Sequence, residues 1–379
     1  MKAKLPLATL LVGLVSLTGY SQTVLSNAED SIHTMNRSLR NEAQSAIDRA
    51  EKWLLSIQQP DGNWSSPEFP ALTGLPLWAM AMDGKMDRVA QKKAVDFILS
   101  HARPNGAIFA TPSEERKGGG LPNYNTAICM LGLHMVNDTK LNPVILKARK
   151  FMTSMQHAGN DEYKGGFGYD ASTKRAYTDL SNTFIAAEAM ALTAQLEDLR
   201  SEKGEIAKID NKALAEYVFN LQQKDGGIRY HPNNSKASTD EENEARQFRS
   251  YGSMTYAGLL TLIYADVDKR DPRARSAYDW TLKHWSLEEN PGMGQQGVYY
   301  FYNVLSKCMA AMGQDVITLE NGQKVNWRTE VVKKLINLQQ IAPDGKGHGY
   351  WTNPTSRWFE ADPVLVTSYT LIALKTALN

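Results

Sequence analysis

The stretch Trp53–Trp64, which reads WLLSIQQPDGNW, is the part of the sequence on which the fold prediction rests. An apolar segment ends in Gln, a turn rich in Asp and Gly follows, and an aromatic residue closes the phrase. Three clear copies and two degenerate ones occur elsewhere: Phe151–Phe167, Tyr217–Ile228, Leu335–Trp351, Phe97–Phe109 and Trp280–Met293. Six copies at intervals of roughly 55 residues indicate a repeat architecture.

A second, more apolar segment follows each of these turns. The six segments begin at Leu72, Asn125, Asn182, Met254, Phe301 and Val366. Five of them share a Thr at the same place: Thr73, Thr126, Thr183, Thr255 and Thr367. In the fifth segment, Asn303 or a neighbour takes that place. A Thr at a helix start is typical of an N-cap, whose hydroxyl accepts a hydrogen bond from a free backbone N–H. We therefore expect these threonines to cap their helices.

The spacing of apolar residues predicts helices for both segments of a repeat. In the first repeat, apolar residues recur every three or four positions with charged residues between them: Ala43, Ile47, Ala50, Leu54 and Ile57. The second segments are apolar nearly all round, as in helices buried on both sides. This pattern predicts an all-α fold, an α6–α6 toroid of six helix pairs that forms a single domain over residues 43–379. The last helix, Asp362–Leu378, then meets the first and closes the ring.

The first 21 residues predict a secretory signal peptide. Lys2 and Lys4 precede an apolar run, Leu5–Leu17, and small or polar residues follow up to Ser21. A polar segment, residues 22–42, leads into the toroid. No later stretch has the length of a transmembrane helix. We expect an exported protein, periplasmic or extracellular, with no membrane span once the signal peptide is removed.

The charge balance bears on the class of partner. The 379-residue chain carries 42 Lys and Arg against 41 Asp and Glu, a net charge of +1, and it has no basic block. Nucleic acid is therefore not an expected partner, because phosphate binding needs clustered cations. The sequence leaves the oligomeric state open.

The phrase at Gln58–Trp64 resembles the QW repeat of the squalene/hopene and oxidosqualene cyclases. Protein prenyltransferase β subunits use the same α/α toroid. The resemblance covers about Gln44–Asn379, and six copies in register carry it. It implies a central cavity that binds a large apolar or isoprenoid molecule, although a fold alone does not determine a function.

The catalytic motif of the cyclases is changed in this chain. In that family an Asp-x-Asp-Asp-Thr motif opens an inner helix, and its middle Asp protonates the substrate. The matching residues here are Asp179, Leu180, Ser181, Asn182 and Thr183. A serine hydroxyl is too weak an acid to make a carbocation, and the chain has the length of one toroid, whereas triterpene cyclases have two. Canonical squalene cyclisation is therefore not expected.

Two carboxyls are candidate catalytic groups. Asp179 keeps the first position of the cyclase motif, and Asp362 precedes Pro363 at the start of the last helix. Each also fits an N-cap, and the sequence does not decide between the two roles.

No metal or cofactor is expected. Prenyltransferases bind zinc through an Asp-x-Cys pair and a His, whereas Cys129 and Cys308 have Ala127 and Ser306 at the place of the Asp. Both cysteines fit buried thiols that pack as small apolar groups. The stretch Gly292–Gln296 is similar to a complement-type thioester motif, but Met293 stands in place of its cysteine.

The pocket of a toroid lies at the N-terminal ends of its inner helices. The candidate lining residues at these ends are Tyr124, Asn125, Ser181, Asn182, Tyr251, Tyr299, Tyr302, Asn303, Trp358 and Glu360. Six helix N-termini that point inward would also attract an anion to the mouth.

Three hypotheses follow for the function. The first is a cyclase-like or prenyltransferase-like protein that binds an apolar or isoprenoid molecule, with or without catalysis. The second is a non-enzymatic exported binding or scaffold protein on the same toroid. The third is a glycan-active α6–α6 enzyme, which would need two carboxylates across the mouth.

Overall fold

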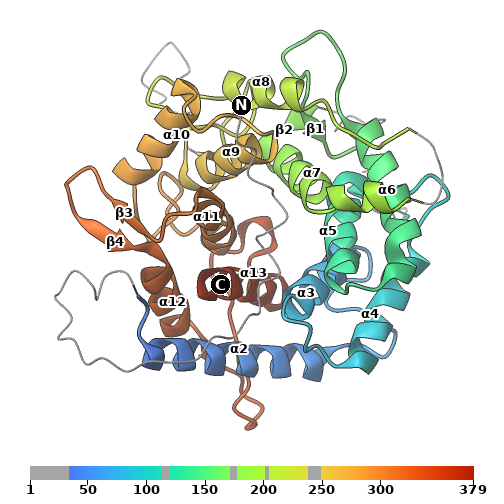
Figure 1. Ribbon diagram of the computed structural model, residues 1–379. Coiled ribbons are helices and arrows are strands. Elements are labelled where there is room, and N and C mark those ends of the chain that lie inside the picture. The colour runs from blue at the N-terminus through green and yellow to red at the C-terminus, as the bar shows by residue number, and fades with distance from the viewer. Residues whose placement is uncertain (1–33, 112–119, 171–176, 201–204, 238–248) are drawn as a thin grey trace, which may run out of the picture.

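The computed structural model describes residues 34–111, 120–170, 177–200, 205–237 and 249–379. The predicted signal peptide, residues 1–21, lies outside this part of the chain, as do residues 22–33 of the predicted polar segment. Within the described residues the protein is mostly helical (Figure 1). The first helix among the described residues begins at Arg37, inside the segment predicted as polar, and buries Leu39.

The first segments of the repeats form helices at the periphery of the molecule (Figure 1). They are α2 (Arg37–Ile57), α4 (Arg88–Ser100), α6 (Asn142–Met155), α8 (Asn211–Asn220), α10 (Pro272–Lys283) and α12 (Trp327–Asn337). Their amphipathic sequences explain this position: α2 buries Ala43, Ile47 and Leu54 on one side and exposes Asp48 and Lys52 on the other.

The second segments form the helices nearer the middle. They are α3 (Ala71–Ala81), α5 (Pro122–Met135), α7 (Leu180–Leu192), α9 (Gly252–Tyr264), α11 (Val298–Met312) and α13 (Pro363–Leu378). Every residue of α3 is buried. These helices are apolar all round because outer helices cover one side and the ring interior the other.

The inner helices close on themselves. Each packs against the next from α3 to α13, and α13 packs against α3 (Figure 1). The predicted helical α/α toroid is thus confirmed in its general form. Among the described residues, short antiparallel hairpins join some helices: β1 (Phe167–Gly168) with β2 (Thr178–Asp179), β3 (Val316–Thr318) with β4 (Lys324–Asn326), and β5 (Gln340–Ile341) with β6 (Gly349–Tyr350).

The Gln of the repeated phrase joins neighbouring repeats. Gln58 Nε2 donates to the carbonyl of Gly62 in its own turn and to that of Ala90 in the next outer helix, both at 3.0 Å. Gln339 Nε2 donates to the carbonyl of Ala46 in α2 at 2.8 Å, which ties the last repeat to the first. The two-carbonyl arrangement recurs at Gln156 and Gln222.

The Gly of the same phrase allows close packing on the next outer helix. Gly62 has a φ of +97°, and a Cβ there would lie 2.2 Å from the backbone oxygen of Lys93 in α4. At Gly165 the corresponding distance to the backbone oxygen of Ala213 in α8 is 2.1 Å. Only glycine fits both the left-handed backbone and this contact.

The prediction that the repeated threonines are N-caps is wrong. Each lies inside its inner helix, and its Oγ1 accepts a hydrogen bond from the backbone N–H that ends the preceding turn. Thr73 accepts from Trp64 at 3.3 Å, and Thr183 accepts from Phe167 at 2.9 Å. The same bond links Thr126 to Ile108, Thr255 to Ile228 and Thr367 to Trp351. The turn enters the core so deeply that its last N–H needs a buried partner.

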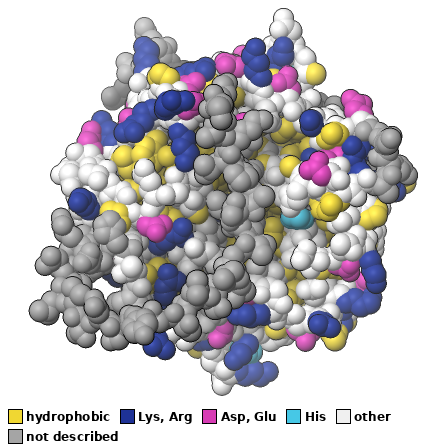
Figure 2. Space-filling model, in the orientation of Figure 1, with side chains coloured by type: hydrophobic (Ala, Val, Ile, Leu, Met, Phe, Trp, Pro, Cys, Tyr) yellow, Lys and Arg dark blue, Asp and Glu magenta, His cyan; other side chains and the backbone are white. Residues whose placement is uncertain are grey.

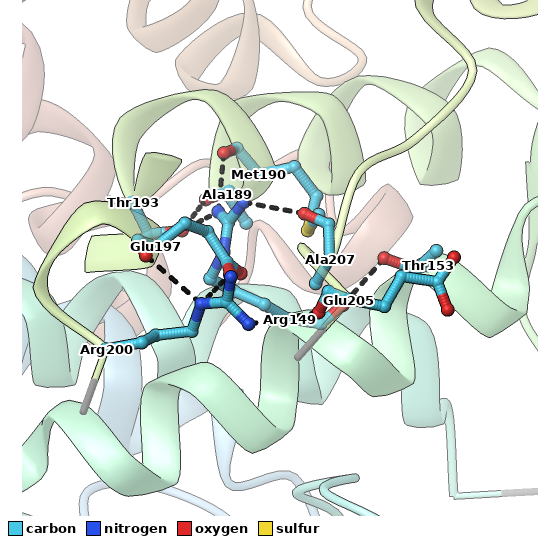
Figure 3. A network of polar contacts seen from close by, with 9 residues as sticks. All are labelled: Arg149, Thr153, Ala189, Met190, Thr193, Glu197, Arg200, Glu205 and Ala207. Atoms are coloured by element: carbon cyan, nitrogen blue, oxygen red, sulfur yellow. Dashed lines mark hydrogen bonds and ion pairs between the residues drawn. The ribbon is translucent and has the colours of Figure 1, made fainter. Parts of the chain in front are cut away.

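A buried arginine joins α6 to the end of α7 (Figure 3). Arg149 Nε donates to Glu197 at 2.8 Å, where Glu197 lies in the 3₁₀ helix η3 (Ala194–Leu199). Its Nη1 donates to Met190 and Thr193, and its Nη2 donates to the carbonyl of Ala207. The guanidinium therefore has a partner on each nitrogen, which buried charges require.

The described surface carries both signs of charge. In Figure 2, Lys and Arg side chains alternate with Asp and Glu, and small apolar patches lie between them. Of the helices that the structure describes, none combines the length and the apolar character needed to cross a membrane.

Candidate functional site

A cavity of about 260 Å³ lies within the ring at the N-terminal ends of the inner helices. Every inner helix contributes to its wall, through residues that include Leu72, Tyr124, Ser181, Met254, Tyr300 and Leu365. Aromatic side chains make up much of the remaining wall: Phe69, Tyr169, Tyr230, Tyr251, Trp358, Phe359 and Tyr369. Since all six helices begin at this cavity, their N-termini lie at one end of the ring.

Three hydroxyls lie close together around Ser181, which lines the cavity. The Tyr124 hydroxyl and Ser181 Oγ form a short hydrogen bond between α5 and α7. The Tyr300 hydroxyl of α11 lies near the same serine, and it is buried with no hydrogen-bond partner among the described residues. Burial raises the pKa of both tyrosines well above the usual value. The cluster can orient a ligand by hydrogen bonds, but all three groups are very weak acids.

Asp179 caps α7 from a fully buried position. Its Oδ1 accepts from the backbone N–H of Asn182 at 2.9 Å, and its Oδ2 accepts from the side-chain amide of Asn182 at 2.8 Å. The Tyr230 hydroxyl also donates to it. Burial is the main reason that its pKa is raised to about 6. Asp179 is not on the cavity wall, whereas Tyr230 is.

Glu360 is a buried carboxyl on the cavity wall. Its Oε1 accepts from the backbone N–H of Tyr300 at the start of α11, and its Oε2 accepts from the amide of Asn353, both at 2.7 Å. Burial raises its pKa to about 7. A carboxyl of this kind is half protonated near neutral pH and can then either donate or accept a proton.

A short segment before α13 forms part of the mouth. Trp358 and Phe359, in the 3₁₀ helix η4 (Arg357–Phe359), have φ angles of +57° and +65°. Both line the cavity, yet they are 41% and 57% exposed. Left-handed backbone is costly for aromatic residues, so their neighbours must hold this shape; Phe359 packs on the ring of Phe69.

In five of the six inner helices described, a backbone N–H of the first turn donates to a side chain of the protein. Asn125 Oδ1 accepts from Ala71 N, and Asn290 Oδ1 accepts from Ser253 N. In three further helices a carboxylate accepts from a backbone N–H: Asp179 from Asn182, Glu360 from Tyr300, and Asp362 from Val364. The chain's own side chains therefore meet part of the attraction that these helix N-termini have for an anion.

The structure brings some of the predicted site residues together and separates others. Six of the predicted lining residues lie on the cavity wall: Tyr124, Asn125, Ser181, Tyr251, Trp358 and Glu360. Six predicted site residues lie off it: Asp179, Asn182, Tyr299, Tyr302, Asn303 and Asp362. The helical phase of α11 turns Tyr300 inward, whereas the Tyr302 hydroxyl donates to the carbonyl of Leu287. Asn182 instead bridges Asp179 and Asn123.

Some wall residues lie outside the aligned helix starts and were not predicted from the sequence. Tyr169 and Tyr230 follow the Gly-rich turns of the third and fourth repeats, and their hydroxyls lie 3.2 Å apart. Lys236 also lines the cavity, with its ammonium 4.7 Å from the centre of the Tyr230 ring. The aromatic residue shortly after each turn was the available signal for the tyrosines.

A family model decides the relationship. The prenyltransferase alpha-alpha toroid domain matches residues 31–141 and 123–297, which together span more than half of the chain. The chain belongs to this family. The resemblance inferred from the repeated phrase is thereby confirmed. No curated protein matches the sequence of this toroid.

Solved structures share the fold of the toroid at low sequence identity. Protein geranylgeranyltransferase-I of Candida albicans, complexed with GGPP, has a TM-score of 0.52 and 14% identity over 87% of this chain and 90% of its own. The type II terpene cyclase MstE from Scytonema has a TM-score of 0.52 and 13% identity, over 89% and 98%. An alpha-1,6-mannanase from Salegentibacter also has a TM-score of 0.52, at 10% identity over 90% and 100%.

The two cysteines of the toroid are free and buried. Burial raises the pKa of both thiols, Cys129 and Cys308, so that they stay protonated.

In the described part of the chain, no group of three or more His, Cys, Asp or Glu side chains is placed to hold a metal ion.

Proposed function

We propose that this toroid binds an uncharged isoprenoid or similar apolar molecule in the cavity of its ring. The wall carries the proposal: aromatic and aliphatic side chains surround the space, with a few hydroxyls and amides at one level. Five of the helix N-termini that could hold a diphosphate already bind a side chain of the protein through one backbone N–H. In two toroid neighbours the bound molecules are likewise isoprenoid, GGPP and geranylgeranyl dihydroxybenzoate.

The size of the cavity favours a small ligand. Ligand pockets usually measure about 300 to 1,000 Å³, and this one measures about 260 Å³. We therefore infer a ligand shorter than the large molecule that the resemblance implies.

We further infer a regular double ring of six outer and six inner helices, and export directed by residues 1–21.

Protonation of an alkene is not the chemistry we propose. That step requires a strong acid, and the cyclase donor position holds Ser181. The nearby carboxyls, Asp179 and Glu360, have pKa values raised to about 6 and about 7, which makes them weaker acids than usual. Binding, or a reaction that asks for a mild acid or base, fits these groups better.

The first test is to purify the protein from its natural host, extract it with organic solvent and identify any bound molecule by mass spectrometry. Geraniol binding is then measured by calorimetry for wild type, Leu72→Trp and Val89→Trp. Leu72 lines the cavity and Val89 is exposed. We expect Leu72→Trp to weaken binding by roughly tenfold or more and Val89→Trp to leave it unchanged.

Empty extracts and no binding of any prenyl alcohol would instead support a scaffold function for the toroid. A glycan-active enzyme has less support, since it needs two carboxylates at the mouth. Among the described residues Glu360 is the one carboxyl on the cavity wall.

A further inference from the structure

A buried ion pair lies inside the ring beyond the cavity. Lys307 of α11 and Glu188 of α7 form it, with Lys307 Nζ 2.8 Å from Glu188 Oε2. The Tyr264 hydroxyl of α9 donates to the other carboxylate oxygen at 3.2 Å. The Glu188 side chain is fully buried and that of Lys307 is one-tenth exposed. None of these three residues is on the cavity wall.

Helix geometry places this pair directly below the cavity. Residues three, four or seven apart share one face of a helix. Lys307 is seven residues after Tyr300, and Glu188 is seven residues after Ser181, and both of those earlier residues line the cavity. Seven residues correspond to about 10 Å along a helix. The side chains also tilt back toward the helix N-terminus, so they point toward the mouth.

Aromatic side chains complete this layer. Lys307 Nζ lies 5.0 Å from the ring centres of both Trp78 and Phe184. Trp78 is three residues after the wall residue Leu75, and Phe184 is three residues after Ser181. Side chains from α3, α7 and α11 therefore meet near the ring axis. On each of these helices, the residue one or two turns closer to the N-terminus lines the cavity.

We propose that the Lys307–Glu188 pair, held between Trp78 and Phe184, is the floor that sets the length of the apolar chain the cavity accepts. This inference rests on the proposed isoprenoid binding. The floor closes the far half of the ring, so a chain that enters at the mouth stops after about 10 Å. The extra carbons of a longer chain would stay in water and would add nothing to its binding free energy.

The test compares two double variants that remove the same charges. Glu188→Ala with Lys307→Ala removes the charges and the volume, whereas Glu188→Leu with Lys307→Met removes the charges and keeps the volume. Single variants are avoided, because each leaves a buried unpaired charge. Geraniol, farnesol and geranylgeraniol are titrated into wild type and both variants, and crystal structures of both variants give the cavity depth.

If the pair is a floor, the alanine variant has a deeper cavity and prefers an alcohol one isoprene unit longer, by roughly tenfold over wild type. The Leu/Met variant keeps the wild-type depth and preference. An unchanged preference in a folded alanine variant that still binds the alcohols overturns the proposal. Equal changes in both variants also overturn it, since the charge and not the volume would then matter. If no alcohol binds any of the three proteins, the isoprenoid proposal has failed, and the cavity depth alone decides whether the pair is a floor.

Discussion

Arg149 shows how a fully charged residue is held inside this fold. Its side chain is 3% exposed, and its guanidinium meets Glu197, Thr193 and the carbonyls of Met190 and Ala207 (Figure 3). The planar fork of arginine matches these four directions, and a lysine could not. The residue thus fastens the outer helix α6 to the C-terminal end of the inner helix α7.

Arg149→Ala is expected to lower the free energy of unfolding by about 3 kcal/mol, because Glu197 loses its buried partner and keeps only Arg200, whose Nε lies 3.0 Å from Oε2. Urea denaturation followed by circular dichroism measures the change. Arg270→Ala is the control, since Arg270 pairs with Asp268 at the surface and should leave the midpoint unmoved. Similar midpoints for the two variants would show that the buried network has no stabilising role.

Glu360 should make the stability depend on pH. Its pKa rises from 4.5 to about 7 in the folded protein because of burial. The folded state therefore binds more protons than the unfolded chain between about pH 4.5 and 7, and the free energy of unfolding falls as the pH rises through this window. The shift corresponds to at most ~3 kcal/mol.

Denaturation curves across this window should show a smaller fall for Glu360→Gln than for wild type. Glu289→Gln, at an exposed site, is the control and should follow wild type. A variant whose stability falls as steeply as that of wild type would rule out Glu360 as the titrating group.

At the scale of the elements, the contact between each turn and its inner helix repeats around the ring. Thr183 Oγ1 accepts from Phe167 N and donates to the carbonyl of Asp179 at 2.7 Å. The turn is therefore held by a side chain of the helix that follows it. A sequence pattern shows that this Thr recurs, but not which backbone group its hydroxyl meets.

Thr183→Val should cost about 1 to 3 kcal/mol, because the Phe167 N–H is left buried without an acceptor. Thr261→Val is a matched control: Thr261 is equally buried in α9, but its hydroxyl only donates to the carbonyl of Ala257. Chemical denaturation of both variants measures the difference. Equal losses would mean that the turn N–H does not depend on the hydroxyl.

At the scale of the whole molecule, the sequence predicted the ring better than its interior. Six similar phrases determine the fold, because each repeat buries its apolar helix only against its neighbours. The phase of a single helix decided that Tyr300 and not Tyr299 faces the cavity. Glu188 and Lys307 lie 119 residues apart, and no local pattern indicates that they meet on the ring axis.

The contact between the last and first repeats is built like the contacts between the other repeats. Gln339 joins α2 much as Gln58 joins α4, and Arg40 donates to the carbonyl of Leu378 at 2.9 Å. A circular permutant that opens in the exposed hairpin turn between Asn321 and Gly322, with Asn379 linked to residue 34 by a short flexible spacer, should fold to the same ring. Its thermal midpoint should stay within a few degrees of that of the parent, and a large drop would show that chain order matters. The stability of the ring would then not depend on which repeat carries the chain termini.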